Sequence, residues 1–385
     1  MKKFSTNKFV IKIFILLQIL FLVVFLLAIK FLPESQGYLG KGLGELVDQP
    51  LVYSRANFDG FHYLKIARDG YGYLQQAFFP FYPRLIKFFQ SFLGSYLVSG
   101  ILISNLSFFL ALFFLAKLLV LEGAKEAVVK KTIFFISFFP TSFYFLSAYT
   151  ESLFLFLLVL SFYLAKKEKW FWAGLVGGLV SFTRIVGIFV FPALVLKYLN
   201  QNGYTLKKII KPNRLKNLLF ICFSCWGLVT YCLMLKKTTG DFLYFVHAQP
   251  QFGAQRTVGK IILLYQVFWR YLKMIFTVDP SNIIYFNVWL EFGTAILFLA
   301  LFLVCLTKFK IPLFYLVFSF LAFILPTLTG TFLSLPRFVL VLFPVFWIMG
   351  KVAVKFRRLG IVYSILSTLL LIVCSALFLR GYWLS

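Results

Sequence analysis

The chain has 385 residues, of which 61% are hydrophobic and only 13% are charged. Charged residues are thus about half as frequent as in soluble proteins, which excludes a water-soluble globular protein and a disordered one. The net charge of +27 comes from 39 Lys and Arg residues against 12 Asp and Glu residues. Because no compact basic domain accompanies this charge, we expect no nucleic-acid partner; the basic residues instead mark the cytoplasmic loops of a multi-pass membrane protein.

The apolar segments that could cross a membrane once follow the chain in order. The first, after the basic start MKKFSTNK, is longer than the apolar core of about 7–15 residues in a signal peptide, so we expect it to remain as a membrane span. A single helical crossing needs about 20 residues. Five segments meet this length: residues 9–32, 96–121, 217–235, 283–307 and 360–379.

Three longer apolar regions are each interrupted by one charged residue. Residues 132–165 contain Glu151, residues 170–196 contain Arg184, and residues 311–350 contain Arg337. Lys and Arg clusters flank each region on both sides, so both ends should be cytoplasmic and the chain should cross an even number of times. Each region is therefore predicted to form a helical pair that turns near the outer face. The second is short enough to be a re-entrant pair lining a cavity.

These assignments predict an all-α, polytopic membrane protein of about eleven transmembrane helices, forming a single domain over residues 1–385. The N-terminus is expected in the cytoplasm, together with residues 197–216, and the membrane is expected to be the plasma membrane. Residues 33–95 and 236–282 are expected outside, and on this arrangement nine of the twelve acidic residues also face outward. The acidic residues did not enter the assignment, so their distribution supports it independently.

The first outer segment carries the densest chemical pattern, NFDGFHYLKIARDGY from residue 57 followed by QQAFFPFYP. In a helix, Asp59, His62, Tyr63 and Ile66 would share one face, and the glycines after Asp69 would end it. A second amphipathic stretch follows at residues 84–93, so two short helices lying in the membrane interface are predicted. Two roles for Asp59 remain open at this point: a helix N-cap or a catalytic carboxylate.

His62 and the three interrupting charges also have alternative interpretations. The imidazole of His62 is either a site residue or an amphipathic interfacial side chain. Glu151 is either a site carboxylate or a solvated residue at an outer turn. Arg184 and Arg337 are favoured as phosphate ligands, because a guanidinium matches phosphate oxygens and buried cations are costly; the alternatives are mutual salt bridges or snorkelling to the interface.

The second outer segment contains HAQPQFGAQR from residue 247, in which Gln249 and Arg256 are candidate substrate ligands. The stretch FWRYLKMIF that follows is predicted to be an interfacial helix with a basic polar face. The chain has no GxxxxGK[ST] or GxGxxG motif, which argues against an enzyme that uses ATP or nucleotide sugars. Because no His, Cys or Asp cluster has metal-ligand spacing, no cofactor is expected, while a requirement for a divalent metal is left open.

Several segments together resemble the PIG-V type mannosyltransferases, a family of the GT-C class of membrane glycosyltransferases. Phe58-Asp59-Gly60 matches the start of the family's first-loop signature, although the family more often has Trp where this chain has Phe58. The other matching segments occur in the family's order: Ile66-Ala67, Gly70-Tyr71, AFFPFYP from Ala77, FFPTSFYFLSAYTESLFL from Phe138, AGLVGGLVSFTRIVG from Ala173, TGDFLYFVHAQ from Thr239 and LPRFVLVLFP from Leu335.

The resemblance implies a GT-C-like fold and transfer of a hexose, mannose in this family, from a polyprenyl-phosphate sugar to a lipid-linked or glycan acceptor on the outer face. The family's catalytic Asp falls on Asp59, and its arginines fall on Arg184 and Arg337. We expect Asp59 to act as a general base and the two arginines to contact the donor phosphate. A lipid or polysaccharide flippase and a non-catalytic subunit are the alternatives. The sequence does not specify the acceptor, the sugar or the oligomeric state.

Overall fold

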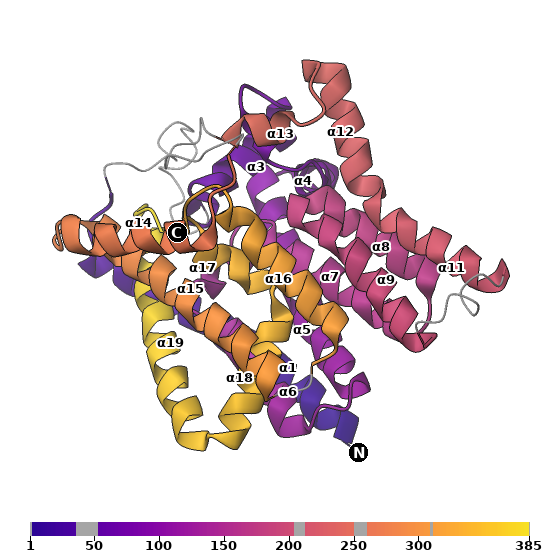
Figure 1. Ribbon diagram of the computed structural model, residues 1–385. Coiled ribbons are helices and arrows are strands. Elements are labelled where there is room, and N and C mark those ends of the chain that lie inside the picture. Colours follow the sequence, from indigo (N-terminus) through magenta and orange to yellow (C-terminus); the bar gives the residue numbers. More distant parts are fainter. Residues whose placement is uncertain (1, 36–52, 204–211, 250–259, 309–310, 385) are drawn as a thin grey trace.

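The computed structural model describes residues 2–35, 53–203, 212–249, 260–308 and 311–384. Within these ranges every regular element is a helix, and no strand occurs (Figure 1). This agrees with the all-α class expected from the apolar periodicity. Arg256 lies outside the described residues.

Five helices are long and apolar enough to cross a membrane, and a sixth crossing is reached if one strongly bent pair is included. They coincide with the five single spans expected from the sequence, whereas the total of eleven spans stays a prediction. The helices concerned are α1 (Lys2–Phe31), α5 (Tyr96–Leu121), α11 (Pro212–Cys222) continued by α12 (Trp226–Thr239), α15 (Ile283–Thr307) and α19 (Arg357–Leu379).

The three interrupted regions form pairs of shorter helices. They are α6 (Glu126–Ser137) with α7 (Glu151–Lys166), α8 (Trp170–Thr183) with α9 (Val190–Gln201), and α16 (Leu313–Thr327) with α18 (Phe343–Lys355). The last pair is joined through α17 (Leu335–Phe338), and the chain bends by 83° where it enters α18. Each interrupting charge lies at or within the break: Glu151 begins α7, Arg184 directly follows α8, and Arg337 lies in α17.

The pairs pack around α5 and α7 in the centre of the molecule (Figure 1). Close approach between α8 and the α11–α12 segment depends on small residues. A Cβ at Gly174 would lie 1.8 Å from the carbonyl oxygen of Phe220, and one at Gly178 would lie 1.8 Å from Nε1 of Trp226. The two glycines are four residues apart and therefore share one helix face, as in other closely packed membrane helices.

Residues 53–95 contain the two short helices predicted for the segment expected outside, α3 (Asp59–Asp69) and α4 (Phe81–Leu93). Gly70 ends α3 with a φ of 85°, which glycine adopts without strain. Helix α4 begins at Phe81, earlier than the predicted residue 84, because a proline in the first turn lacks only an N–H that has no helical partner there. The Tyr82 hydroxyl donates to the Gly100 carbonyl at 2.9 Å and so fixes α4 to α5.

The second segment that is expected outside contains α13 (Tyr244–His247) and α14 (Leu264–Thr277). Helix α14 is the amphipathic helix predicted there. Its Arg270 donates to the Gly330 carbonyl at 2.9 Å, so this cation supports the loop before α17. The Tyr271 hydroxyl donates to the carboxylate of Glu291, which is buried in α15.

Candidate functional site

Two unusual backbone turns begin the elements that carry Asp59 and Arg337. Phe58, directly before α3, has a φ of 57°, and Ser334, directly before α17, has a φ of 63°. Left-handed conformations of residues other than glycine cost of the order of 1–3 kcal/mol and persist where the surrounding structure imposes them. Both helices therefore start from geometrically constrained turns that aim Asp59 and Arg337 at one another.

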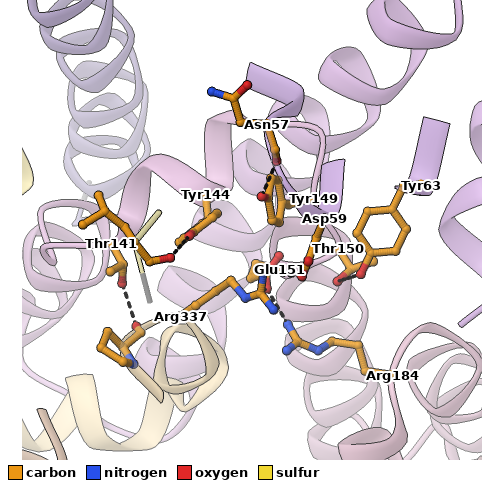
Figure 2. A network of polar contacts seen from close by, with 12 residues as sticks. Asn57, Asp59, Tyr63, Thr141, Tyr144, Tyr149, Thr150, Glu151, Arg184 and Arg337 are labelled. Atoms are coloured by element: carbon orange, nitrogen blue, oxygen red, sulfur yellow. Dashed lines mark hydrogen bonds and ion pairs between the residues drawn. The ribbon is translucent and has the colours of Figure 1, made fainter. Parts of the chain in front are cut away.

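Four charged side chains meet in a continuous network between α3, α7, α8 and α17 (Figure 2). Arg337 donates from Nη1 to Oδ2 of Asp59 at 2.5 Å, and its Nε lies 3.3 Å from Oε1 of Glu151. Arg184 donates from Nη1 to the same Glu151 oxygen at 2.7 Å. Glu151 is thus shared by two guanidinium groups, while Asp59 has one of them as its partner.

The network bears on three of the alternatives that the sequence left open. Asp59 is the first residue of α3 rather than its N-cap, and α3 has no side-chain cap. The Glu151 side chain is 2% exposed rather than solvated. Arg184 and Arg337 form ion pairs with carboxylates, because two largely buried cations need compensating charge; their contact with a donor phosphate stays a prediction.

Aromatic rings hold the Arg337 guanidinium from the other sides. Its central carbon lies 5.5 Å from the ring centre of Tyr144, 5.6 Å from that of Tyr149 and 5.2 Å from that of Phe338. The Tyr149 hydroxyl in turn donates to the Asn57 carbonyl at 2.6 Å. The arginine is therefore fixed by cation–π contacts as well as by ion pairs.

Asp59 is the more accessible carboxylate of the network, with 21% of its side chain exposed. Together with Arg184 and Arg337 it lines a cavity of about 230 Å³. The wall also contains Trp383, which is 38% exposed and whose ring meets Phe58 edge to face at 5.1 Å. The cavity thus places two arginines and an aromatic side chain beside one accessible carboxylate. This combination suits a polar ligand that contains a ring.

A second cavity, of about 220 Å³, adjoins the first and is mainly apolar. Five residues line both cavities: Arg184, Ile185, Gln249, Leu333 and Phe338. The remaining wall of the second cavity comes from α13, from α16 and from the residues after Arg184, among them Phe245, Ala322, Leu325 and Pro326. The two cavities together can hold an amphiphile whose charged part lies near Arg184.

The other candidate residues of the first outer segment have different positions. Tyr63 lines the polar cavity, and its hydroxyl lies 3.3 Å from that of Thr150. His62 is outside the cavity lining; its ring stacks on Phe78 at 5.0 Å, and its Nδ1 lies 3.4 Å from Nε2 of Gln75. Burial lowers the pKa of His62, although the charge of Asp59 acts in the opposite direction. This position favours a neutral imidazole that supports the cavity wall through its contact with Phe78.

Gln249 lies where the second outer segment meets the site. Its amide donates to the Phe245 carbonyl at 3.3 Å, and the side chain lines both cavities. The described residues contain no group of three or more His, Cys, Asp or Glu side chains that could hold a metal ion. In the network itself, Oδ2 of Asp59 and Oε1 of Glu151 are paired with guanidinium groups.

Comparison with known proteins finds no family model and no curated sequence that matches the chain significantly. Among solved structures, the apo form of the oligosaccharyltransferase from Archaeoglobus fulgidus is similar, with a TM-score of 0.45 and 14% identity, over 95% of this chain and 56% of that one. The oligosaccharyltransferase AglB from the same archaeon, in complex with an inhibitory peptide and a dolichol-phosphate, gives a TM-score of 0.41 and 13% identity, over 96% of this chain and 56% of that one. The chain thus spans about half the length of these structures. Similarity at this level does not transfer an activity, so the proposed function rests on the residues of the site.

Three site residues were not identified from the sequence: Tyr144, Tyr149 and Trp383. The two tyrosines occur in the buried segment FYFLSAYT before Glu151, where they look like ordinary apolar filling. Trp383 reaches the site because residues after α19 fold back into the molecule; the Asn287 amide donates to its carbonyl at 2.9 Å. The sequence signal that could have identified the two tyrosines is their position directly before Glu151, a charged residue within an apolar segment.

Proposed function

We propose that the chain is a membrane glycosyltransferase that moves a hexose, mannose by the family resemblance, from a polyprenyl-phosphate sugar to a lipid-linked or glycan acceptor on the outer face. One observation carries the proposal: an accessible carboxylate and two arginines line a polar cavity that continues into an apolar one. This is the shape and charge that an isoprenoid phosphate carrying a sugar requires.

The donor would place its phosphate near Arg184, which lines both cavities. Its prenyl chain would then lie against the apolar residues of α16 and α13, and its sugar would lie in the polar cavity beside Asp59. Arg184 has 15% of its side chain exposed and uses one terminal nitrogen for Glu151. Its remaining N–H groups are available for phosphate oxygens.

The chemical step would form a bond between the acceptor oxygen and the anomeric carbon as the bond from that carbon to the phosphate oxygen breaks. Asp59 would accept the hydroxyl proton, an effect worth about 10²–10⁴ in rate. The polyprenyl phosphate would leave with one additional negative charge. As Asp59 becomes neutral, Arg337 loses one of its two charged partners, keeps Glu151, and can stabilise the leaving phosphate, so the total charge of the site is constant throughout.

The proposal is tested with purified protein and a panel of radiolabelled polyprenyl-phosphate sugars, with nucleotide sugars as the control donors. We expect transfer of label from one polyprenyl-phosphate hexose to an added lipid or glycan acceptor, and none from nucleotide sugars. Movement of intact lipid-linked sugar across proteoliposomes without transfer would contradict the proposal and favour the flippase alternative. Transfer from nucleotide sugars alone would refute the assigned donor.

A further inference from the structure

A third cavity, of about 360 Å³, lies between α1, α5, α6 and α7, far from the ion-pair network. On α5, Gly100 accepts a hydrogen bond from α4 near the network end of the helix, whereas Lys117 lines the cavity. The 17 residues between them correspond to about 25 Å of helix. In Figure 1 the N-terminal end of α1 and the start of α6 lie at the opposite end of the molecule from α3. The cavity is therefore at the other membrane face, the expected cytoplasmic one.

The charged residues of this cavity are Lys117, Lys167 and Glu126. Glu126 is paired with Lys130, one helical turn away, at 2.8 Å. Among the described residues, neither Lys117 nor Lys167 has a carboxylate partner, and the Lys117 ammonium lies over the Phe113 ring at 3.9 Å. The cavity thus carries an excess positive charge on two separate helices.

Neighbouring groups add to this charge and supply neutral hydrogen-bond donors. At the adjacent end of α5, Glu122 is shared by two ammonium groups, Lys166 at 3.0 Å and Lys197 at 3.8 Å, and so does not offset the cavity lysines. Thr6, Asn7 and Tyr163, whose side chains carry hydroxyl or amide groups, line the cavity as well. Lysine, hydroxyl-bearing and amide side chains around one cavity are a combination that suits a phosphate group.

The apolar part of the wall indicates where the phosphate comes from. Ala116, Val120, Leu121 and Ala124 complete the lining, and Val120 is 51% exposed on the outside of the helix bundle. On the adjacent helix α1, Ile11 and Ile15 are 47% and 50% exposed. The cavity therefore opens beside the apolar surface that would contact acyl chains. We propose that it binds the phosphate of an anionic phospholipid headgroup, a site separate from the donor site and independent of the proposed activity.

The test is native mass spectrometry of the full chain with phosphatidylglycerol, with phosphatidylcholine as the neutral-headgroup comparison. We expect one retained phosphatidylglycerol per chain, bound about 30-fold more weakly after Lys117→Gln/Lys167→Gln, which corresponds to about fivefold per basic side chain. The control is Lys125→Gln/Lys169→Gln, which removes the same charge from exposed lysines at the same end of the molecule that do not line the cavity. It should leave binding unchanged.

Three outcomes would overturn the proposal. The first is an equal loss of binding in both double variants, which would show a general charge effect. The second is equal retention of phosphatidylcholine. The third is that inorganic phosphate alone stabilises the protein as much as phosphatidylglycerol does. The site would then bind a free anion rather than a lipid.

Discussion

Replacing Glu151 with Gln probes the buried network more directly than any other single change. The Glu151 side chain is 2% exposed and lies 2.7 Å from Arg184 and 3.3 Å from Arg337. The substitution keeps the shape but leaves two largely buried cations with Asp59 as their one remaining carboxylate. Breaking a buried ion pair in this way costs about 3–5 kcal/mol. Because the arginines are 15% and 11% exposed, we expect the lower end, about 3 kcal/mol, and a fall of several degrees in Tm.

The control is Glu126→Gln, which breaks an ion pair of similar length, 2.8 Å, between side chains that are 36% and 37% exposed. That pair should be worth at most about 0.5 kcal/mol. The double variant Glu151→Gln/Arg184→Gln should recover part of the loss, because it also removes an uncompensated cation. The assay is thermal unfolding in one detergent at fixed lipid content. A Glu151→Gln variant as stable as Glu126→Gln would refute the view that a desolvated network organises the site.

Three further predictions concern substrate binding and topology. Arg184→Ala should raise the KM for the polyprenyl-phosphate donor about tenfold or more and leave the acceptor KM unchanged, because a phosphate contact is lost. A donor KM equal to that of the unmodified protein in steady-state assays would show that Arg184 does not bind the phosphate. Trp383→Ala should raise the donor KM, and Trp383→Phe should raise it less, because the ring lines the cavity assigned to the donor sugar; an unchanged donor KM in Trp383→Ala would contradict this. Single cysteines at Lys237 and Lys169, in a background without native cysteines, should react with impermeant reagents from the outside and the inside respectively; the reverse would overturn the predicted topology.

Much of the helical framework could be predicted because apolar length and flanking charge are local properties. The single-span segments appear as long helices, and the three interrupted regions break at or close to the charges that interrupt them. Gly70 and the prolines after it likewise define α3 and α4 through their own backbone preferences.

The partners within the site could not be predicted, because they depend on the tertiary fold. Arg337 and Asp59 are 278 residues apart, and no local pattern specifies their contact. The sequence left salt bridges among the interrupting charges as one alternative and a site role for Glu151 as another, with no local signal to choose between them. Once the helices pack, these three residues and Asp59 are brought together, and the four charges balance. Trp383 was missed for the same reason, since only the return of the chain after α19 brings its ring to Asp59.

The role of Asp59 as general base is the central claim, and its carboxylate also pairs with Arg337. Loss of the ion pair and loss of the base must therefore be separated. Azide offers this separation because it attacks the anomeric carbon without giving up a proton. If Asp59 is the base, transfer to azide should largely survive in Asp59→Asn while transfer to a hydroxyl acceptor fails. Asp69→Asn, at the exposed end of α3 where Asp69 pairs with Arg68, is the matched control.

The most direct measurement is kcat for sugar transfer to a hydroxyl acceptor by Asp59→Asn, at saturating donor and acceptor and at a temperature where the variant is folded. We expect kcat to fall by at least about 100-fold, the lower bound for lost general-base catalysis, while Asp69→Asn stays within a few-fold of the unmodified protein. A kcat for Asp59→Asn near that of the unmodified protein would contradict the mechanism and leave Asp59 as the ion-pair partner that holds Arg337 in place.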